Sequence, residues 1–198
     1  MHWLCICALI TLSYRHPDRQ MANPDHIAQF ERGAEEWNAW RRDNPTIDPD
    51  LSGMDLTGRF LHHMDLTRVD FSDAFLTVAE LEHANLDRAN LTRCNMTGAD
   101  LSNATLRDAT LHGADLSYAT LTFADLTGAD LTDARLSEAI LFNAVARLTN
   151  MNGVHMRETI LTGADLTGAT FEGASLRDVI SEGAILPISW PGAERKKS

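Results

Sequence analysis

The sequence of 198 residues contains few cysteines, few prolines and few aromatic residues, and it has fewer basic than acidic residues. Aromatic residues make up 7% of the chain, and there are only three cysteines and six prolines. Lysine and arginine number 17 against 28 aspartates and glutamates, so the formal net charge is −11. This balance disfavours a protein that binds nucleic acid or an anionic membrane through a basic patch.

Long apolar runs are also missing, because nothing approaches the roughly 18 consecutive residues of a membrane span. The run from Trp3 to Leu12 has no lysine or arginine before it and no small-residue cleavage site after it. We interpret residues 1–20 as an upstream extension before a natural start at Met21; a weak signal or anchor and a disordered leader are the alternatives. Without this segment Cys94 is the only cysteine, which fits a reducing cytoplasm.

The motifs of common enzyme classes are absent as well, since the sequence has no GxSxG, HExxH or CxxC. Residues 163–168 have the glycine spacing of a phosphate-binding loop, but Ala169 stands in place of the required lysine and the segment repeats the five-residue pattern described below. Cys94 stands at an alanine position of the repeat described below, which indicates a small core residue and not a nucleophile. We therefore predict no catalytic, cofactor-binding or metal-binding residues.

What the sequence has in abundance is a repeat of five residues. From Leu51 to Leu186 there are 28 positions at this spacing, and 26 of them carry Leu, Met or Phe, the exceptions being Ala146 and Ser181. Alanine fills 18 of the 27 positions that lie two residues before, from Met54 onward. A repeat this regular indicates the fold more strongly than the helix or strand propensities of individual residues.

The period of five excludes the usual elements. Five residues advance about 500° around an α-helix, so the leucines would spiral around it and leave no buried face. In a straight strand an odd period places successive leucines on opposite faces. The chain must therefore turn after every unit, with alanine and leucine pointing inward and the residue between them outward. The remaining two residues form a corner, where Asp, Asn, Ser, Thr and Gly are frequent.

The recurring pattern A(D/N)LxG resembles the pentapeptide-repeat family, and the resemblance covers residues 51–186. It implies an all-β fold, a right-handed quadrilateral parallel β-helix with four pentapeptides per coil. Residues 49–186 are then expected to form a solenoid of about seven coils. The preceding stretch "FERGAEEWNAWRRDNPTIDPDLSG" also resembles the helical leaders of some bacterial members.

Both ends of such a solenoid expose sheet edges that need covering. Residues 21–48 are predicted to form one amphipathic helix, with Asn23 as its cap and Pro24 in its first turn. Its apolar stripe is expected to cap the first coil, through Ile27, Phe30, Trp37 and Trp40.

At the other end, residues 187–198 are expected to supply a second cap and a basic tail. The capping residues would be Ile188 and Trp190.

Sorting outward and corner residues by their place in the 20-residue coil gives three groups of surface residues. The first is a candidate acidic partner face: Asp50, Asp70, Asp73, Asp130 and Asp133. The second is an apolar candidate self-association patch in the C-terminal half: Phe123, Ile140, Phe142, Ile160 and Ile180. The third gathers His62, His63 and His83 with Glu80 and Glu82, which we interpret as a solvated outer face in preference to a metal or proton site.

These surfaces predict a cytoplasmic, non-catalytic protein-interaction or scaffold module with no direct nucleic-acid or membrane binding and with an unknown protein partner. The apolar patch favours a homodimer through the C-terminal coils, while folding of the C-terminal segment over the patch is the alternative. The family resemblance implies a second function, an acidic DNA mimic that binds a type II topoisomerase (DNA gyrase). An enzyme is the third class, and the filled core argues against it.

Overall fold

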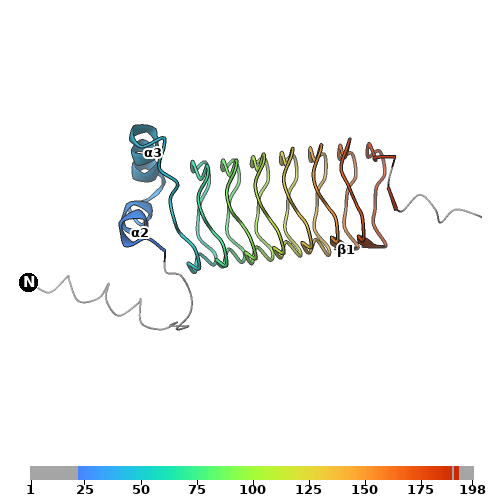
Figure 1. Ribbon diagram of the computed structural model, residues 1–198, viewed down its shortest axis with the longest axis horizontal. Helices are drawn as coiled ribbons and strands as arrows, with labels where there is room; N and C mark the ends of the chain where they lie inside the picture. The colour runs from blue at the N-terminus through green and yellow to red at the C-terminus, as the bar shows by residue number, and fades with distance from the viewer. Residues whose placement is uncertain (1–21, 189, 192–198) are drawn as a thin grey trace, which may run out of the picture.

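The computed structural model describes residues 22–188, 190 and 191. Residues 1–20, which we interpret as an upstream extension, and the expected basic tail after residue 191 lie outside the described residues. Two helices, α2 (Pro24–Phe30) and α3 (Ala34–Asp43), precede a long stack of coils, as Figure 1 shows. Two short strands, β1 (His155–Arg157) and β2 (Ser175–Arg177), lie in the coils at the C-terminal end of the stack.

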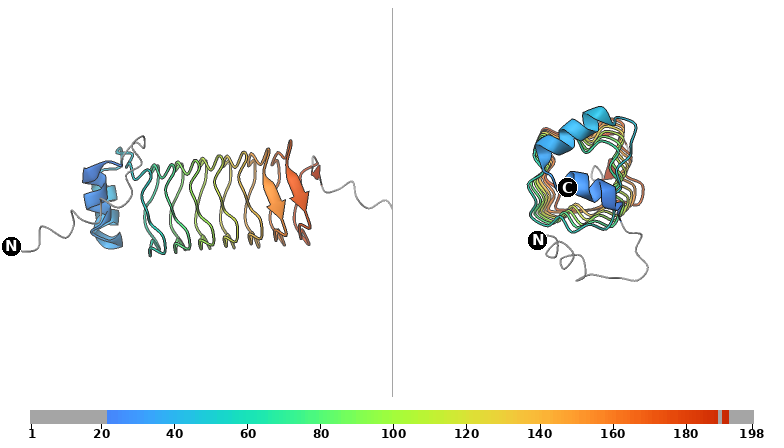
Figure 2. Two further views of the ribbon diagram at one scale, coloured as in Figure 1. Left: turned by 90° about the horizontal axis from the view of Figure 1, so that it is seen from below. Right: turned by 90° about the vertical axis from the view of Figure 1, so that its left-hand side faces the viewer.

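Parallel backbone pairing between residues 20 apart builds the stack. It begins with a bridge between Asp50 and Asp70 and continues to the bridge between Asp165 and Ile185. Strands β1 and β2 keep the same register, with His155 opposite Ser175. Because every pairing spans 20 residues, each coil holds four pentads, and Figure 2 shows the coils superimposed in an end-on view. The expectation that the chain turns after each unit is confirmed.

The interior of the stack is filled by the two inward positions of each pentad. Leu101 and Ala104, in the middle of the ladder, are fully buried, and the same holds for nearly every leucine and alanine from Leu51 to Leu166. The buried side chains form one continuous cluster that also includes aromatic residues from both ends. The repeat therefore forms a solid core, in which close packing of aliphatic groups supplies the stabilisation.

The corners explain why aspartate and asparagine recur at the outward position. The Oδ1 atom of Asp125 accepts hydrogen bonds from the backbone N–H and the hydroxyl of Thr127, at 3.0 and 2.6 Å. The same backbone bond to the residue two places on recurs from Asp50 to Asp165. These short side chains satisfy a corner N–H that the coil itself leaves free.

The second corner residue has a positive φ in each turn, a conformation that glycine adopts without strain. Residues other than glycine also occupy it, among them Val78 at φ 49° and Leu148 at φ 56°. A side chain in this left-handed region costs of order 1–2 kcal/mol, most of all when it is β-branched. The coil geometry thus overrides local preference at these corners.

The prediction of a single N-terminal helix is wrong, because the segment forms two helices. Gly33 separates them with a φ of 103°, which an L-residue adopts only with strain. The predicted N-cap is confirmed, since the Asp25 N–H donates to Asn23 Oδ1 at 2.9 Å. Helix α3 ends at Asp43, just before Asn44 and Pro45, as the proline predicts.

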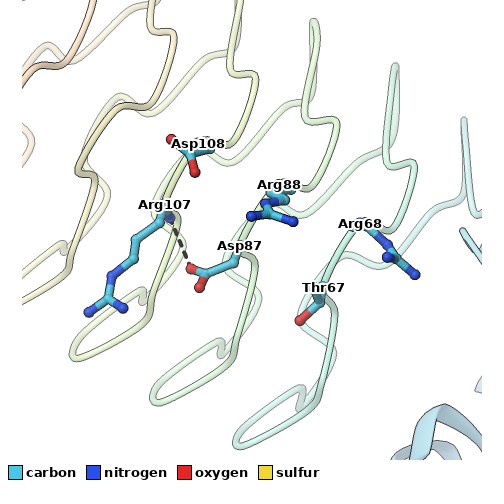
Figure 3. Close-up of a pocket in the computed structure, with 6 residues that line it drawn as sticks. All are labelled: Thr67, Arg68, Asp87, Arg88, Arg107 and Asp108. Atoms are coloured by element: carbon cyan, nitrogen blue, oxygen red, sulfur yellow. Dashed lines mark hydrogen bonds between the residues drawn. The ribbon is translucent and has the colours of Figure 1, made fainter. Parts of the chain in front are cut away.

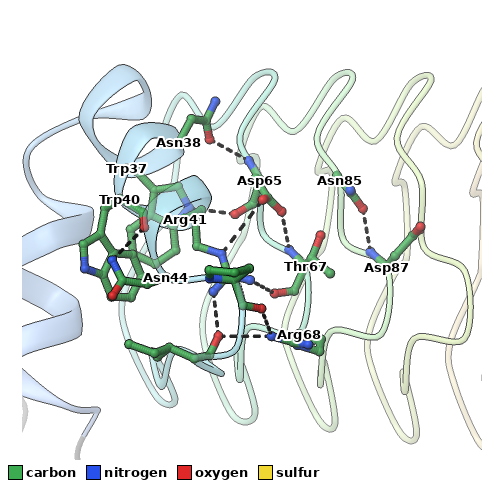
Figure 4. Close-up of polar contacts among 12 residues, drawn as sticks. Trp37, Asn38, Trp40, Arg41, Asn44, Asp65, Thr67, Arg68, Asn85 and Asp87 are labelled. Carbon is green, nitrogen blue, oxygen red and sulfur yellow. Dashed lines mark hydrogen bonds and ion pairs between the residues drawn. The ribbon is translucent and has the colours of Figure 1, made fainter.

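Side chains of α3 bind the backbone edge of the first coil, as Figure 4 shows. Trp37 Nε1 donates to Asp65 O at 2.8 Å, and Asn38 Oδ1 accepts the Asp65 N–H at 2.8 Å. Arg41 donates to Ile47 O at 2.7 Å and to Thr67 O at 2.8 Å. These contacts replace the backbone groups that a preceding coil would have supplied.

At the C-terminal end Trp190 is buried and its ring lies edge-on against Phe171, at a centroid distance of 4.9 Å. Ile188, which we expected to share this role, is fully exposed. That part of the expectation is wrong, because the chain leaves the coil with Ile188 directed into solvent.

No helix among residues 22–188, 190 and 191 is long and apolar enough to cross a membrane.

Candidate functional site

The apolar patch predicted in the C-terminal half lies on one face of the stack. Ile140, Ile160 and Ile180 occupy the same outward position in three successive coils and are joined by parallel bridges. Ile140 and Ile160 are half-buried by their neighbours, whereas Ile180 is 51% exposed. The fixed 20-residue register therefore turns three separated isoleucines into one continuous apolar column.

Two phenylalanines widen this column at the adjoining corner. Phe123 and Phe142 contact each other edge to face, with a centroid distance of 6.0 Å, and Phe123 is 54% exposed. Phe123 also has a positive φ of 59°, a conformation disfavoured for an aromatic residue. Exposed apolar groups clustered on a rigid surface are typical of protein interaction sites.

The predicted acidic face is assembled, but its carboxylates also serve the fold. Asp50 and Asp70 are paired across the first two coils, and further along the column Asn90 and Thr110 separate them from Asp130. One oxygen of Asp50, Asp70 and Asp130 accepts a corner N–H.

At the corner of the same face, Arg93 forms a two-bonded ion pair with Asp73, at 2.8 and 2.7 Å. The hydrogen bond that Arg93 donates to Asp73 raises the pKa of the Arg93 guanidinium above its ordinary value. Asp133 remains exposed on this surface. Neutralisation by Arg93 and the turn bonds reduce the acidic character that the sequence alone suggested.

The histidine-rich surface lies on the same face as the apolar column, in the N-terminal half. His63 and His83 stack in parallel on adjacent coils, with a centroid distance of 4.8 Å. His62 lies between two glutamates of the next coil: its Nε2 is 3.0 Å from Glu80 Oε2, and its Nδ1 contacts Glu82 Oε2. The ligand-type atoms of His62, Glu80 and Glu82 all lie within 4.8 Å of one another.

A second polar surface carries alternating arginines and aspartates. It includes a hollow of about 310 Å³, drawn in Figure 3, that is lined by Thr67, Arg68, Asp87, Arg88, Arg107 and Asp108. Asp87 Oδ1 accepts the Arg107 N–H at 3.0 Å, and the Arg107 side chain points away to pair with Asp125 at 2.6 Å. The charges of this hollow largely compensate one another, so it offers no concentrated field for a ligand.

The same Arg–Asp pair recurs two coils further on, between Arg147 and Asp165 at 2.6 Å. Partial burial raises the pKa of Asp125, but hydrogen bonds from Thr127 and Arg107 outweigh it and hold this pKa below the ordinary value. For Asp165, the hydroxyl of Thr167 is the main cause of a lowered pKa, and the arginine adds to it. The lowered pKa values thus arise from the corner hydrogen bonds of the threonines, to which the structural ion pairs add.

Two further titratable groups are enclosed by the fold. Burial raises the pKa of the Cys94 thiol to about 12, with a contribution from Asp73, which agrees with the expected role as a core residue. Arg41 is only 3% exposed, and its desolvation lowers the pKa of the guanidinium, while Asp65 opposes this effect. Sequence reasoning missed Arg41; its only signal is a single arginine on the same helical face as Trp37.

The parallel coils of 20 residues enclose a filled apolar core and differ from one another mainly in their surface residues. This architecture defines a β-solenoid repeat protein. Two family models match the chain: the pentapeptide repeat region over residues 64–141, and eight copies of the pentapeptide repeat over residues 139–178. The chain therefore belongs to the pentapeptide-repeat family, whose members form right-handed β-helices. None of the curated proteins matches the chain.

Several solved structures are similar to the chain. Rfr23, a pentapeptide repeat protein from Cyanothece 51142, is 21% identical, with 73% of this chain and 97% of that chain covered and a TM-score of 0.49. HetL from Nostoc sp. PCC 7120, which is involved in heterocyst differentiation regulation, is 28% identical, with 73% and 77% covered and a TM-score of 0.34. QnrB1, a plasmid-mediated fluoroquinolone resistance protein, is 19% identical, with 70% and 73% covered and a TM-score of 0.45.

Proposed function

We propose that this protein is a non-catalytic protein-interaction module that forms a homodimer through its C-terminal coils. The observation that carries the proposal is the apolar column of Ile140, Ile160 and Ile180, which continues into Phe123 and Phe142. Burying exposed apolar area contributes roughly 25 cal/mol per Å², and a rigid surface loses little conformational entropy on association. A second copy of the chain presents an identical apolar surface, as an isologous interface requires.

The proposal includes the organisation of the chain. Residues 21–48 act as the N-terminal cap through Ile27, Phe30, Trp37 and Trp40, all of which pack against the core cluster. Residues 49–186 contribute about seven coils of four pentads, and the segment after residue 186 closes the other end in part. A rod of this kind offers flat faces of different character while its interior remains inaccessible.

Sedimentation equilibrium of the full chain tests the dimer. The double substitution Ile160→Lys/Ile180→Lys places two charges in the apolar column and should convert the dimer to a monomer. Asp100→Lys is the control, because Asp100 occupies the same outward column but is separated from Ile140 by a further coil and lies outside the apolar patch. A wild-type chain that stays monomeric at high concentration, or a double variant that still dimerises, would contradict the proposal.

The second candidate function is an acidic mimic of DNA that acts on a type II topoisomerase. The net charge of −11 and the stacked Asp50 and Asp70 favour it. The interruption of the column and the pairing of Asp73 with Arg93 place it second. A DNA gyrase supercoiling assay distinguishes the two functions, because a pure interaction module changes neither supercoiling nor the sensitivity of gyrase to fluoroquinolones.

A further inference from the structure

The group formed by His62, Glu80 and Glu82 is brought together by the coil register. Glu82 follows His62 by one full coil, and the His63 N–H donates to Glu82 O at 3.1 Å, which fixes the two coils at this point. Glu80 occupies the outward position of the same coil and is paired with Phe60. The three side chains therefore come from two rigidly connected coils, not from a loop.

Among the described residues, His62 is the one basic side chain that contacts the two glutamates. Glu82 Oε2 is shielded from solvent and has no hydrogen-bond partner of acceptable geometry among the described residues, although it contacts His62 Nδ1. Within the same residues, neither Glu80 nor Glu82 forms an ion pair with lysine or arginine. Two carboxylates thus converge on one imidazole, and a shielded oxygen remains without a directed donor, which is costly unless a cation compensates for it.

We propose that His62, Glu80 and Glu82 form a binding site for a divalent transition-metal ion of the zinc type. An imidazole nitrogen and carboxylate oxygens are ligands of Zn²⁺ at about 2.0–2.2 Å. The ligand atoms lie within 4.8 Å of one another, close enough for one ion to reach all three after small rotations of the side chains. Imidazole in the donor set favours zinc, nickel or copper over magnesium or calcium.

The partial exposure of the group suits a site that an ion can enter from solvent. The three side chains are between 31% and 44% exposed, so water completes the coordination shell. Because the ligands belong to successive coils, a bound ion cross-links the first part of the ladder. It binds the folded chain and not the unfolded one, so it should raise the unfolding temperature in a concentration-dependent way.

Isothermal titration with Zn²⁺ tests this site on the full chain. Cys5 and Cys7 are replaced by serine in every sample, because thiolates near the N-terminus would bind zinc in their own right. We expect one ion per chain in this background, with Mg²⁺ unable to compete. His62→Gln and Glu82→Gln should each weaken Zn²⁺ binding at least tenfold. Glu80→Gln should also weaken binding, and it leaves the corner unchanged because Glu80 occupies an outward position.

His112→Gln is the matched control, because His112 occupies the same corner position of its pentad as His62 but is not part of the metal-ligand group. Circular dichroism before each titration verifies that the coil is intact. A Zn²⁺-dependent rise in the unfolding temperature should accompany binding and disappear in His62→Gln. The proposal is overturned if the background chain does not bind Zn²⁺, or if the control and the three ligand variants bind it equally.

Discussion

The two ends of the ladder are finished in different ways. At the N-terminal end, Trp37, Asn38 and Arg41 occupy the hydrogen-bonding sites of an absent coil (Figure 4). At the C-terminal end, inward residues of the last coil such as Leu176 remain partly exposed, and Trp190 covers Phe171. A sheet edge can thus be closed by side chains in place of a strand, and the C-terminal end is closed less completely than the N-terminal one.

Trp37→Ala should cause the largest loss of stability, because it removes a buried side chain that covers the N-terminal end of the ladder. The ring is fully buried, and its indole N–H donates to Asp65 O, so removal leaves both a cavity and an unpaired carbonyl. We expect a loss of about 3–5 kcal/mol in the free energy of unfolding, measured by urea denaturation. Trp40→Ala is the control, since Trp40 lies beside Trp37 and is only partly buried. If both substitutions lowered the free energy of unfolding equally, full burial of Trp37 would not be the cause of its contribution.

Trp190→Ala should cost less, about 1–3 kcal/mol, because Trp190 covers one side of a single ring at the less closed end. Ile188→Ala should change the free energy of unfolding by less than about 0.5 kcal/mol, since Ile188 is fully exposed. Hydrogen exchange in the last coil should accelerate in Trp190→Ala while exchange in the first coil stays constant. Equal acceleration at both ends would show that the ladder unfolds as a single unit.

The regular part of this structure follows directly from the sequence. A period of five requires a turn in every unit, and a fixed 20-residue register places Ile140, Ile160 and Ile180 in one column. Asn23 as an N-cap and the end of α3 before Pro45 also follow from local chemistry. These features were predictable because each depends on neighbouring residues or on a repeat without insertions.

The irregular parts could not be predicted in the same way. Gly33 divides the N-terminal segment because the two helices must pack across the end of the first coil, a constraint that is tertiary. Arg41 is buried and donates to Ile47 and Thr67, which lie outside its own helix, so the sequence of the helix does not specify these contacts. The convergence of Glu80 and Glu82 on His62 depends on side-chain rotamers, which the repeat pattern does not specify.

The ion pairs Arg107–Asp125 and Arg147–Asp165 are equivalent in the repeat but lie at different distances from the C-terminal end, so they test whether the two ends differ in stability. The pKa values of Asp125 and Asp165 are lowered in the folded chain, so these carboxylates stabilise it above the unfolded pKa, about 3.9. That contribution is lost as the pH falls through the folded pKa values. Asp125→Asn and Asp165→Asn should each cost less than about 1 kcal/mol at pH 7, because the arginines are exposed.

The pH dependence of urea denaturation, followed from pH 7 to pH 2.5, measures this effect. Each asparagine variant should show a smaller loss of stability in acid than the wild type, because its position no longer titrates. If the coils near the C-terminal end unfold separately, Asp165→Asn should accelerate hydrogen exchange only there. Acid curves identical to the wild type would show that these pairs do not contribute to folding.

A small stabilising effect should come from relieving strain at two corners, one in the N-terminal half of the ladder and one in the C-terminal half. Val78 and Leu148 are exposed and hold positive φ values of 49° and 56°, so glycine removes a backbone cost of about 1–2 kcal/mol. Glycine also raises the entropy of the unfolded chain, which costs roughly 0.5–1 kcal/mol and leaves a net gain of about 0 to 1.5 kcal/mol. Urea denaturation should show this gain for Val78→Gly. A smaller gain for Leu148→Gly would indicate that the C-terminal coils open before the rest, because strain relieved in an already unfolded coil cannot stabilise the ladder.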